Sequence, residues 1–232
     1  MVPGVVVPGV ALGIVGILMD DADLALVIAL DCSASVSLES FGLMASGCAA
    51  GLRDEAVVAG LLGGPLGASL CALMIWSGPG AQEVMVEWTR LSSPDALAAF
   101  AGEVENVPRT IRAGATAIGD ALRACEALLL AAPAGASRVV IDMVGDGKSN
   151  QGILPAGVRD RLVAGGVTVN GLCVLHDEPD LLAHYQAEVI GGAGAFAMTC
   201  ADFSAFAEAM RQKLRREIIA SAGLAQRQVS RR

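Results

Sequence analysis

The sequence predicts an α/β protein with a doubly wound, mostly parallel sheet, one antiparallel edge strand and helices on both faces. Short apolar runs alternate with Ala/Leu-rich stretches of helical length, the pattern of repeated strand–helix units. The apolar runs are nearly continuous, as expected of strands buried on both faces. Hydrophobic residues make up 54% of the 232 residues, which is enough for a large core and too many for a disordered chain.

Each element follows from a local pattern. The run over 24–30 is the first strand, and a single long helix is expected after it. Residues 83–89 alternate between apolar and polar side chains after a Gly-Pro-Gly turn, so they predict a hairpin partner at the sheet edge. Pro94 follows Ser93 at the start of a short helix. The predicted strands are 24–30, 66–77, 83–89, 138–144, 166–175 and 194–198, and the predicted helices are 38–58, 94–104, 116–131, 155–164, 179–189 and 202–220.

A carboxylate and two hydroxyls directly follow the first strand, at Asp31, Ser33 and Ser35. Ligands of open α/β sheets bind at the carboxyl ends of the strands. Two further oxygen groups lie at comparable positions: Thr116 precedes a helix, and Asp146 ends the strand over 138–144 in an Asp-Gly turn. Hard oxygen donors suit a hard divalent cation, and Mg²⁺ (or Mn²⁺) fits best.

This set of five residues resembles the metal-ion-dependent adhesion site (MIDAS) of von Willebrand factor type A (vWA) domains, whose pattern is Asp-x-Ser-x-Ser, a later Thr, and a later Asp before Gly. Every ligand position of that pattern is filled here. Cys32 and Ala34 depart from the residues usual between the ligands, but neither is a ligand. The phrases around Trp88, and over 116–122, 144–152, 169–172 and 190–196, also resemble a bacterial group of uncharacterised vWA proteins.

Each motif taken alone has a simpler interpretation. Asp and Ser often bond nearby backbone amides in turns and caps, Thr116 alone reads as a helix N-cap, and Asp146-Gly147 alone reads as a tight turn. Their order and shared placement at element ends favour the metal site. Lys148, Ser149 and Asn150 follow on the same rim, where they contact a ligand or form a solvated loop. Asp142, inside an apolar strand, requires a buried partner.

The composition excludes several classes of function. A net charge of −8 with 3% aromatic residues argues against nucleic acid as a partner. The six cysteines contain no Cys-x-x-Cys pair, and the only histidines are His176 and His184, so no zinc-site spacing is present. Cys71, Cys125 and Cys173 fall inside predicted elements and read as buried thiols.

The N-terminal segment is the part of the sequence that indicates where the protein is located. Residues 2–19 contain no charged side chain and resemble the core of a signal peptide, at the short end of what spans a bilayer. We therefore divide the chain into an export signal or membrane anchor (1–22), a vWA domain (23–220) and a disordered basic tail (221–232). The protein is expected to be secreted or periplasmic, or alternatively anchored to a membrane by its N-terminus.

The resemblance implies a non-enzymatic binding module. In vWA domains the MIDAS cation binds an acidic residue, Asp or Glu, of a partner protein. A Mg²⁺-dependent hydrolase or phosphoryl-transfer enzyme is an alternative, since Asp31 follows a strand as an aspartyl nucleophile would. A structural subunit with a loop-rigidifying metal is another. No phosphate-binding loop of Walker type and no Gly-x-Ser-x-Gly motif is present, which weighs against an enzyme.

Overall fold

The computed structural model describes residues 20–229 and confirms the predicted fold class. Its main sheet has six strands in the order β4-β3-β2-β6-β7-β8. Every neighbouring pair is parallel except β3 and β4, so β4 is the antiparallel edge strand that the alternating pattern predicted. The strands are β2 (Leu24–Asp31), β3 (Ser69–Trp76), β4 (Gln82–Leu91), β6 (Val139–Gly145), β7 (Thr168–Val174) and β8 (Ala197–Cys200).

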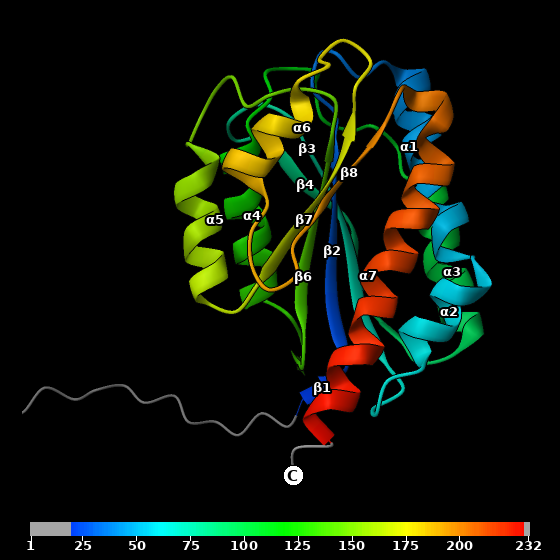
Figure 1. The fold of residues 1–232 in the computed structure, drawn as a ribbon. Coiled ribbons are helices and arrows are strands. Elements are labelled where there is room, and N and C mark those ends of the chain that lie inside the picture. The colour runs from blue at the N-terminus through cyan, green and yellow to red at the C-terminus, as the bar shows by residue number, and fades with distance from the viewer. Residues whose placement is uncertain (1–19, 230–232) are drawn as a thin grey trace, which may run out of the picture.

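Helices cover both faces of this sheet (Figure 1). One layer, on the left of the figure, contains α4 (Ile118–Leu130), α5 (Pro155–Ala164) and α6 (Leu181–His184), which continues as the π-helical turn η1 (Tyr185–Val189). The other layer contains α1 (Leu38–Leu52), α2 (Glu55–Leu62), α3 (Pro94–Glu105) and α7 (Phe206–Val229), with the 3₁₀ turn η2 (Phe203–Ala205) before α7.

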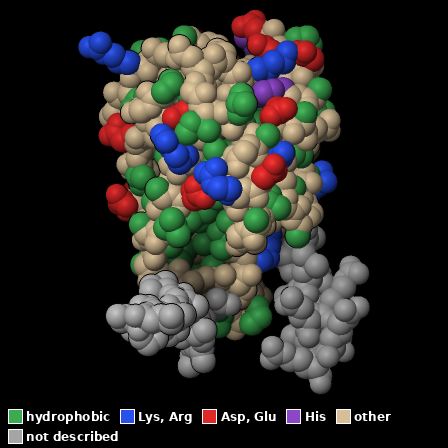
Figure 2. Space-filling model, turned by 90° about the vertical axis from the view of Figure 1, so that its left-hand side faces the viewer, with side chains coloured by type: hydrophobic (Ala, Val, Ile, Leu, Met, Phe, Trp, Pro, Cys, Tyr) green, Lys and Arg blue, Asp and Glu red, His purple; other side chains and the backbone are tan. Residues whose placement is uncertain are grey.

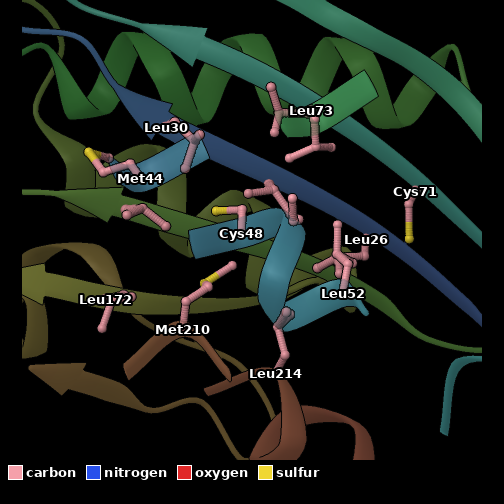
Figure 3. Packing of buried hydrophobic residues seen from close by; sticks show 14 of the residues in the cluster. Leu26, Leu30, Met44, Cys48, Leu52, Cys71, Leu73, Leu172, Met210 and Leu214 are labelled. Atoms are coloured by element: carbon pink, nitrogen blue, oxygen red, sulfur yellow. The ribbon is translucent and has the colours of Figure 1, made fainter. Parts of the chain in front are cut away.

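Strand β2 sends alternate side chains to two separate cores. Leu26 and Leu30 pack toward α1 and α7, where Met44, Cys48 and Leu214 meet them (Figure 3). The intervening Val27 and Ala29 join the cluster under α4, α5 and η1. All eight residues of β2 are buried, so the strand is fixed by packing on both faces and its carboxyl end is a rigid platform.

The helix predicted over 38–58 is wrong as a single element. It ends at Leu52, and a second helix, α2, begins after Asp54. The Asp54 carboxylate accepts hydrogen bonds from the amides of Ala56 and Val57. An aspartate in this position caps a new helix rather than continuing the old one, and the capping signal lay inside a continuous apolar pattern.

The two ends of the chain also differ from expectation. A parallel pair, β1 (Asp20–Ala22) with β5 (Gly135–Ala136), is too short to show a sequence pattern. Helix α7 continues to Val229, past the end predicted at residue 220 and into the tail predicted to be disordered. Residues 1–19 of the predicted signal lie outside the described residues. Among residues 20–229, no helix is long and apolar enough to cross a membrane.

Asp142 has the buried partner that its position required. The Lys213 ammonium of α7 contacts the Asp142 carboxylate and lies 3.3 Å from Oε2 of Glu217, with both groups of each pair excluded from solvent. Asn170 on β7 donates to Oε1 of Glu217 at 3.0 Å. These buried contacts attach α7 to β6 and β7.

Candidate metal centre

The two predicted carboxylates lie at the same edge of the sheet. Strands β2 and β6 are parallel neighbours, with Leu30 opposite Val144, so the residues that follow them meet. The Ser35 hydroxyl donates to Oδ1 of Asp146 at 2.7 Å, and the hydroxyl oxygens of Ser33 and Ser35 are 3.3 Å apart. The amide of Ser33 donates to Oδ1 of Asp31 at 2.6 Å. Four of the five predicted oxygen groups therefore form one hydrogen-bonded cluster.

Thr116 joins this cluster from the loop before α4. A Cβ placed on Gly147 would lie 3.3 Å from the Thr116 hydroxyl, so the threonine packs against the turn that carries Asp146. The N-cap interpretation of Thr116 is wrong, because the N-cap residue of α4 is Ala117, with no side-chain capping bond. The Thr116 side chain is buried against the turn after β6, and it does not cap the helix.

The rim residues have defined partners within the chain. The side-chain oxygen Oδ1 of Asn150 accepts a hydrogen bond from the backbone N–H of Thr116 at 2.9 Å. The backbone N–H of Asn150 donates to the Thr116 carbonyl, also at 2.9 Å. Lys148 forms ion pairs with Glu178 at 3.2 Å and with Asp180 at 2.6 Å. Asn150 therefore holds the threonine loop in place, and the Lys148 charge is balanced by two carboxylates.

Ser149 and the two histidines complete the surroundings. The Ser149 amide donates to Nε2 of His184 at 3.2 Å, which makes that nitrogen an acceptor and fixes the neutral imidazole. Burial lowers the pKa of His184, in keeping with this role. His176 lies 3.8 Å from Asp177 in an exposed position. Charged and histidine side chains gather at this end of the molecule, at the upper edge of Figure 2.

The electrostatics of the cluster favour a cation. Burial, followed by the neighbouring charge of Asp146, raises the pKa of Asp31 to about 7. Burial also raises the pKa of Asp146, while its hydrogen bond from Ser35 acts in the opposite direction. Two buried carboxylates that repel each other are stabilised by a bound divalent cation. Oδ2 of Asp31, moreover, has no hydrogen-bond partner within residues 20–229.

The donor set also indicates which metals fit. Two carboxylates and three hydroxyls are hard oxygen ligands, which suit Mg²⁺ or Mn²⁺. No group of three or more His, Cys, Asp and Glu side chains in the described part of the chain could hold a metal ion. The site therefore lacks the nitrogen and sulfur ligands of ordinary structural zinc centres.

Arg109 is a part of the site that the sequence did not reveal. It lies in the loop between α3 and α4, and its guanidinium donates to the carbonyls of Val36 and Cys32 at 2.7 Å and of Ser33 at 3.1 Å. A planar guanidinium with several donors can hold a loop by its backbone. Arg109 thus fixes the backbone that carries Ser33 and Ser35.

The described residues also form a surface hollow away from this site. An apolar hollow of about 290 Å³ lies beside β5 and the C-terminal end of α4, lined in part by Leu129, Leu130 and Leu162. It is visible as the recessed green area near the lower end of Figure 2. Its lining includes Ala25 and Val139, at the starts of β2 and β6, so it lies at the opposite end of the sheet from Asp31 and is separate from the candidate metal centre.

Comparison with solved structures places the fold among vWA domains. Proximal thread matrix protein 1 from the mussel byssus, with a zinc-occupied MIDAS motif, is 19% identical with a TM-score of 0.61 over 86% of this chain and 47% of that chain. Von Willebrand factor type A from Catenulispora acidiphila is 19% identical with a TM-score of 0.60 over 85% and 43%. The vWF domain of the type V pili tip protein Mfa5 from Porphyromonas gingivalis is 10% identical with a TM-score of 0.55 over 86% and 96%.

These likenesses establish a vWA-like fold and no more, because identity is low. The chain spans less than half the length of the byssus and Catenulispora proteins. Among curated proteins, none matches this chain. A family model covers almost all of the described domain, from residue 21 to residue 222. The chain therefore belongs to the family described as Protein of unknown function (DUF1194).

Proposed function

We propose that the protein is a metal-ion-dependent protein-binding module. In this proposal Asp31, Ser33, Ser35, Thr116 and Asp146 hold Mg²⁺ or Mn²⁺, and an exposed Asp or Glu of a partner protein completes the coordination. The observation that carries the proposal is the convergence of two buried carboxylates and three hydroxyls at one edge of a vWA-like sheet. Three of the five groups are neutral hydroxyls, which are weak donors, so the bound cation remains a good electron-pair acceptor for the carboxylate of a partner.

The protein's own residues support this chemistry in three ways. Arg109 and Asn150 hold the two ligand loops by backbone hydrogen bonds, so the oxygens are preorganised. Ser35 is an exposed residue whereas Asp31 is buried, which leaves one side of the cluster accessible to a partner. The MIDAS motif of the byssus protein holds zinc, which supports a divalent cation in the same fold.

The enzyme alternative has little support from the surroundings of the site. His184 already accepts a backbone amide, and burial keeps it neutral. His176 points to Asp177 at the surface. Among the described residues, neither histidine is therefore arranged as a general base beside Asp31. A turnover screen with phosphate esters, in which the purified protein with Mg²⁺ is inactive, is the expected result.

Metal binding is tested first, by calorimetry on the purified protein. We expect one Mg²⁺ or Mn²⁺ per chain and an increase in thermal stability, because a ligand specific for the folded state stabilises it. Asp31→Ala should abolish binding and Asp146→Ala should weaken it. Thr199→Ala, which removes an exposed hydroxyl from β8, is the matched control and should bind normally. Unchanged binding by Asp31→Ala would contradict the site.

Partner capture is tested separately with immobilised peptides that differ only in Glu against Gln. Binding should require the carboxylate and Mg²⁺ or Mn²⁺, and a chelator should reverse it. Thr116→Ala should reduce capture more than metal affinity. Metal binding without any carboxylate-dependent capture would favour a structural metal, and capture that survives both chelator and Asp31→Ala would show that the partner uses another surface.

Location is the third part of the proposal. We infer export to the periplasm or exterior from the charge-free segment 2–19. Mature protein recovered from cells should then begin near Asp20–Asp23, as N-terminal sequencing would show. Full-length protein in the membrane fraction would indicate an anchor, and intact N-terminal peptides in the cytoplasmic fraction would contradict export.

A further inference from the structure

Tyr185 is the only tyrosine of the chain and is fully buried at the start of the π-helical turn η1. Its ring lies directly on β7: a Cβ on Gly171 would come within 2.6 Å of its Cδ1 atom. The Ile190 amide donates to the Tyr185 carbonyl at 2.9 Å, a bond from residue i+5 to residue i. Such π turns are rare and often occur at functional sites. Here the wider turn and the missing side chain of Gly171 together give the ring its place.

The hydroxyl of this tyrosine reaches the candidate metal centre. A Cβ on Gly145 would lie 3.0 Å from Oη of Tyr185 and 2.8 Å from Oδ2 of Asp31. The two oxygens therefore border the same space above the last residue of β6. Both are buried, and neither has a hydrogen-bond partner among residues 20–229. Two adjacent buried polar atoms left unpaired are costly, so their proximity requires an explanation.

We propose that Tyr185 is a positioning residue for Asp31, and that its hydroxyl donates a hydrogen bond to Oδ2, directly or through one bridging water, when the centre holds its cation. This inference rests on the proposed function, because it assigns a supporting group to that same site. Gly145 is required in this arrangement, since any side chain there would separate the two oxygens.

The direction of the hydrogen bond follows from the chemistry of the two groups. An ionised carboxylate only accepts, and a phenol can donate. A phenol ordinarily loses its proton only near pH 10, so the buried Tyr185 hydroxyl keeps its proton at neutral pH. A carboxylate ligand that is also hydrogen-bonded from behind is held in one orientation, which strengthens metal binding.

The same segment supports the site at a second point. His184, the residue before Tyr185, accepts the amide of Ser149 in the loop that follows Asp146. Two consecutive side chains of the α6–η1 segment therefore face the two carboxylate-bearing loops. The segment from Leu181 to Val189 forms a wall of the metal centre, although it contributes no metal ligand.

The test compares Tyr185→Phe with wild type in metal titrations. The substitution removes only the hydroxyl, so the ring and its packing remain. We expect a loss of Mg²⁺ or Mn²⁺ affinity of roughly 10-fold, the scale typical of supporting groups around metal ligands, with no loss of thermal stability in chelator. Ser69→Ala is the control: it removes a buried hydroxyl at the opposite end of β3 and should leave metal affinity unchanged.

A spectroscopic measurement distinguishes positioning from general packing. Tyrosine labelled with ¹³C at Cζ gives a single signal, because Tyr185 is the only tyrosine. Addition of Mg²⁺ should shift this signal in wild type, and Asp31→Asn should abolish the shift. This inference alone would be overturned if wild type bound the metal but its Cζ signal did not move, and if Tyr185→Phe bound the metal with unchanged affinity. Failure of wild type to bind any metal would overturn the proposed function with it.

Discussion

Replacement of Asp31 by Asn should stabilise the metal-free protein while it destroys the metal site. The pKa of Asp31 rises from 3.8 to about 7 because the carboxyl group is buried beside Asp146. Each pKa unit corresponds to about 1.4 kcal/mol, so holding Asp31 ionised above pH 7 opposes folding by on the order of 4 kcal/mol. Asn keeps the shape and can still accept the Ser33 amide, but it carries no charge.

The sign of the pH dependence follows from this shift. Between about pH 4 and pH 7 the folded state holds a proton at Asp31 that the unfolded state has released, so the stability of wild type falls as the pH rises through this window. Above the folded-state pKa, the loss is complete and constant. Asp31→Asn lacks this contribution, so the stability difference between variant and wild type should be near zero at pH 4 and largest at pH 8.

Urea unfolding in chelator, at several values between pH 4 and pH 8, measures this difference. A parallel series with saturating Mg²⁺ should reverse the order of stability at pH 8, because only wild type gains the binding free energy. If Asp31→Asn in chelator were less stable than wild type at pH 8, or if the difference did not grow with pH, the electrostatic account of the site would be refuted.

Two further substitutions test the support of the fold and of the site. Lys213→Met should lower the free energy of unfolding by roughly 3–5 kcal/mol in a urea titration, since it leaves buried carboxylates without their cation. Lys148→Met removes the cation of a partly exposed ion pair and should change the free energy of unfolding far less in the same titration. Arg109→Ala should weaken Mg²⁺ binding about 10-fold in calorimetry. Arg53→Ala, which breaks a surface ion pair with Glu105, is the control and should bind Mg²⁺ as wild type does. Equal Mg²⁺ affinities of Arg109→Ala and wild type would contradict the role of Arg109 in holding the loop of Ser33 and Ser35.

The fold was predictable because its signals are local. Strands β2 and β3 are nearly continuous apolar runs, and the alternating strand β4 differs from them in its pattern of burial. The five proposed ligands were found in the same way, because each lies next to a strand or helix end. Their meeting at one sheet edge follows from the parallel pairing of β2 and β6.

The remaining parts of the site depend on contacts between distant segments. Arg109 acts on carbonyls more than seventy residues earlier in the chain, and a lone arginine in a loop carries no pattern. Tyr185 reads as an ordinary core aromatic until Gly145 and Gly171 are seen to make room for it. The break between α1 and α2 was missed because the cap at Asp54 interrupts an apolar periodicity that continues on both sides.

The six buried thiols can report local opening of the protein through their rates of chemical labelling. All six cysteines are free and buried, and burial is the main cause that raises the pKa of every one of them. Since the thiolate is the reactive form, a thiol reagent modifies these positions only when the surrounding element opens. Single-cysteine versions that retain Cys71 on β3, Cys125 on α4 or Cys200 on β8 would thus report, by their labelling rates, which part of the sheet separates first.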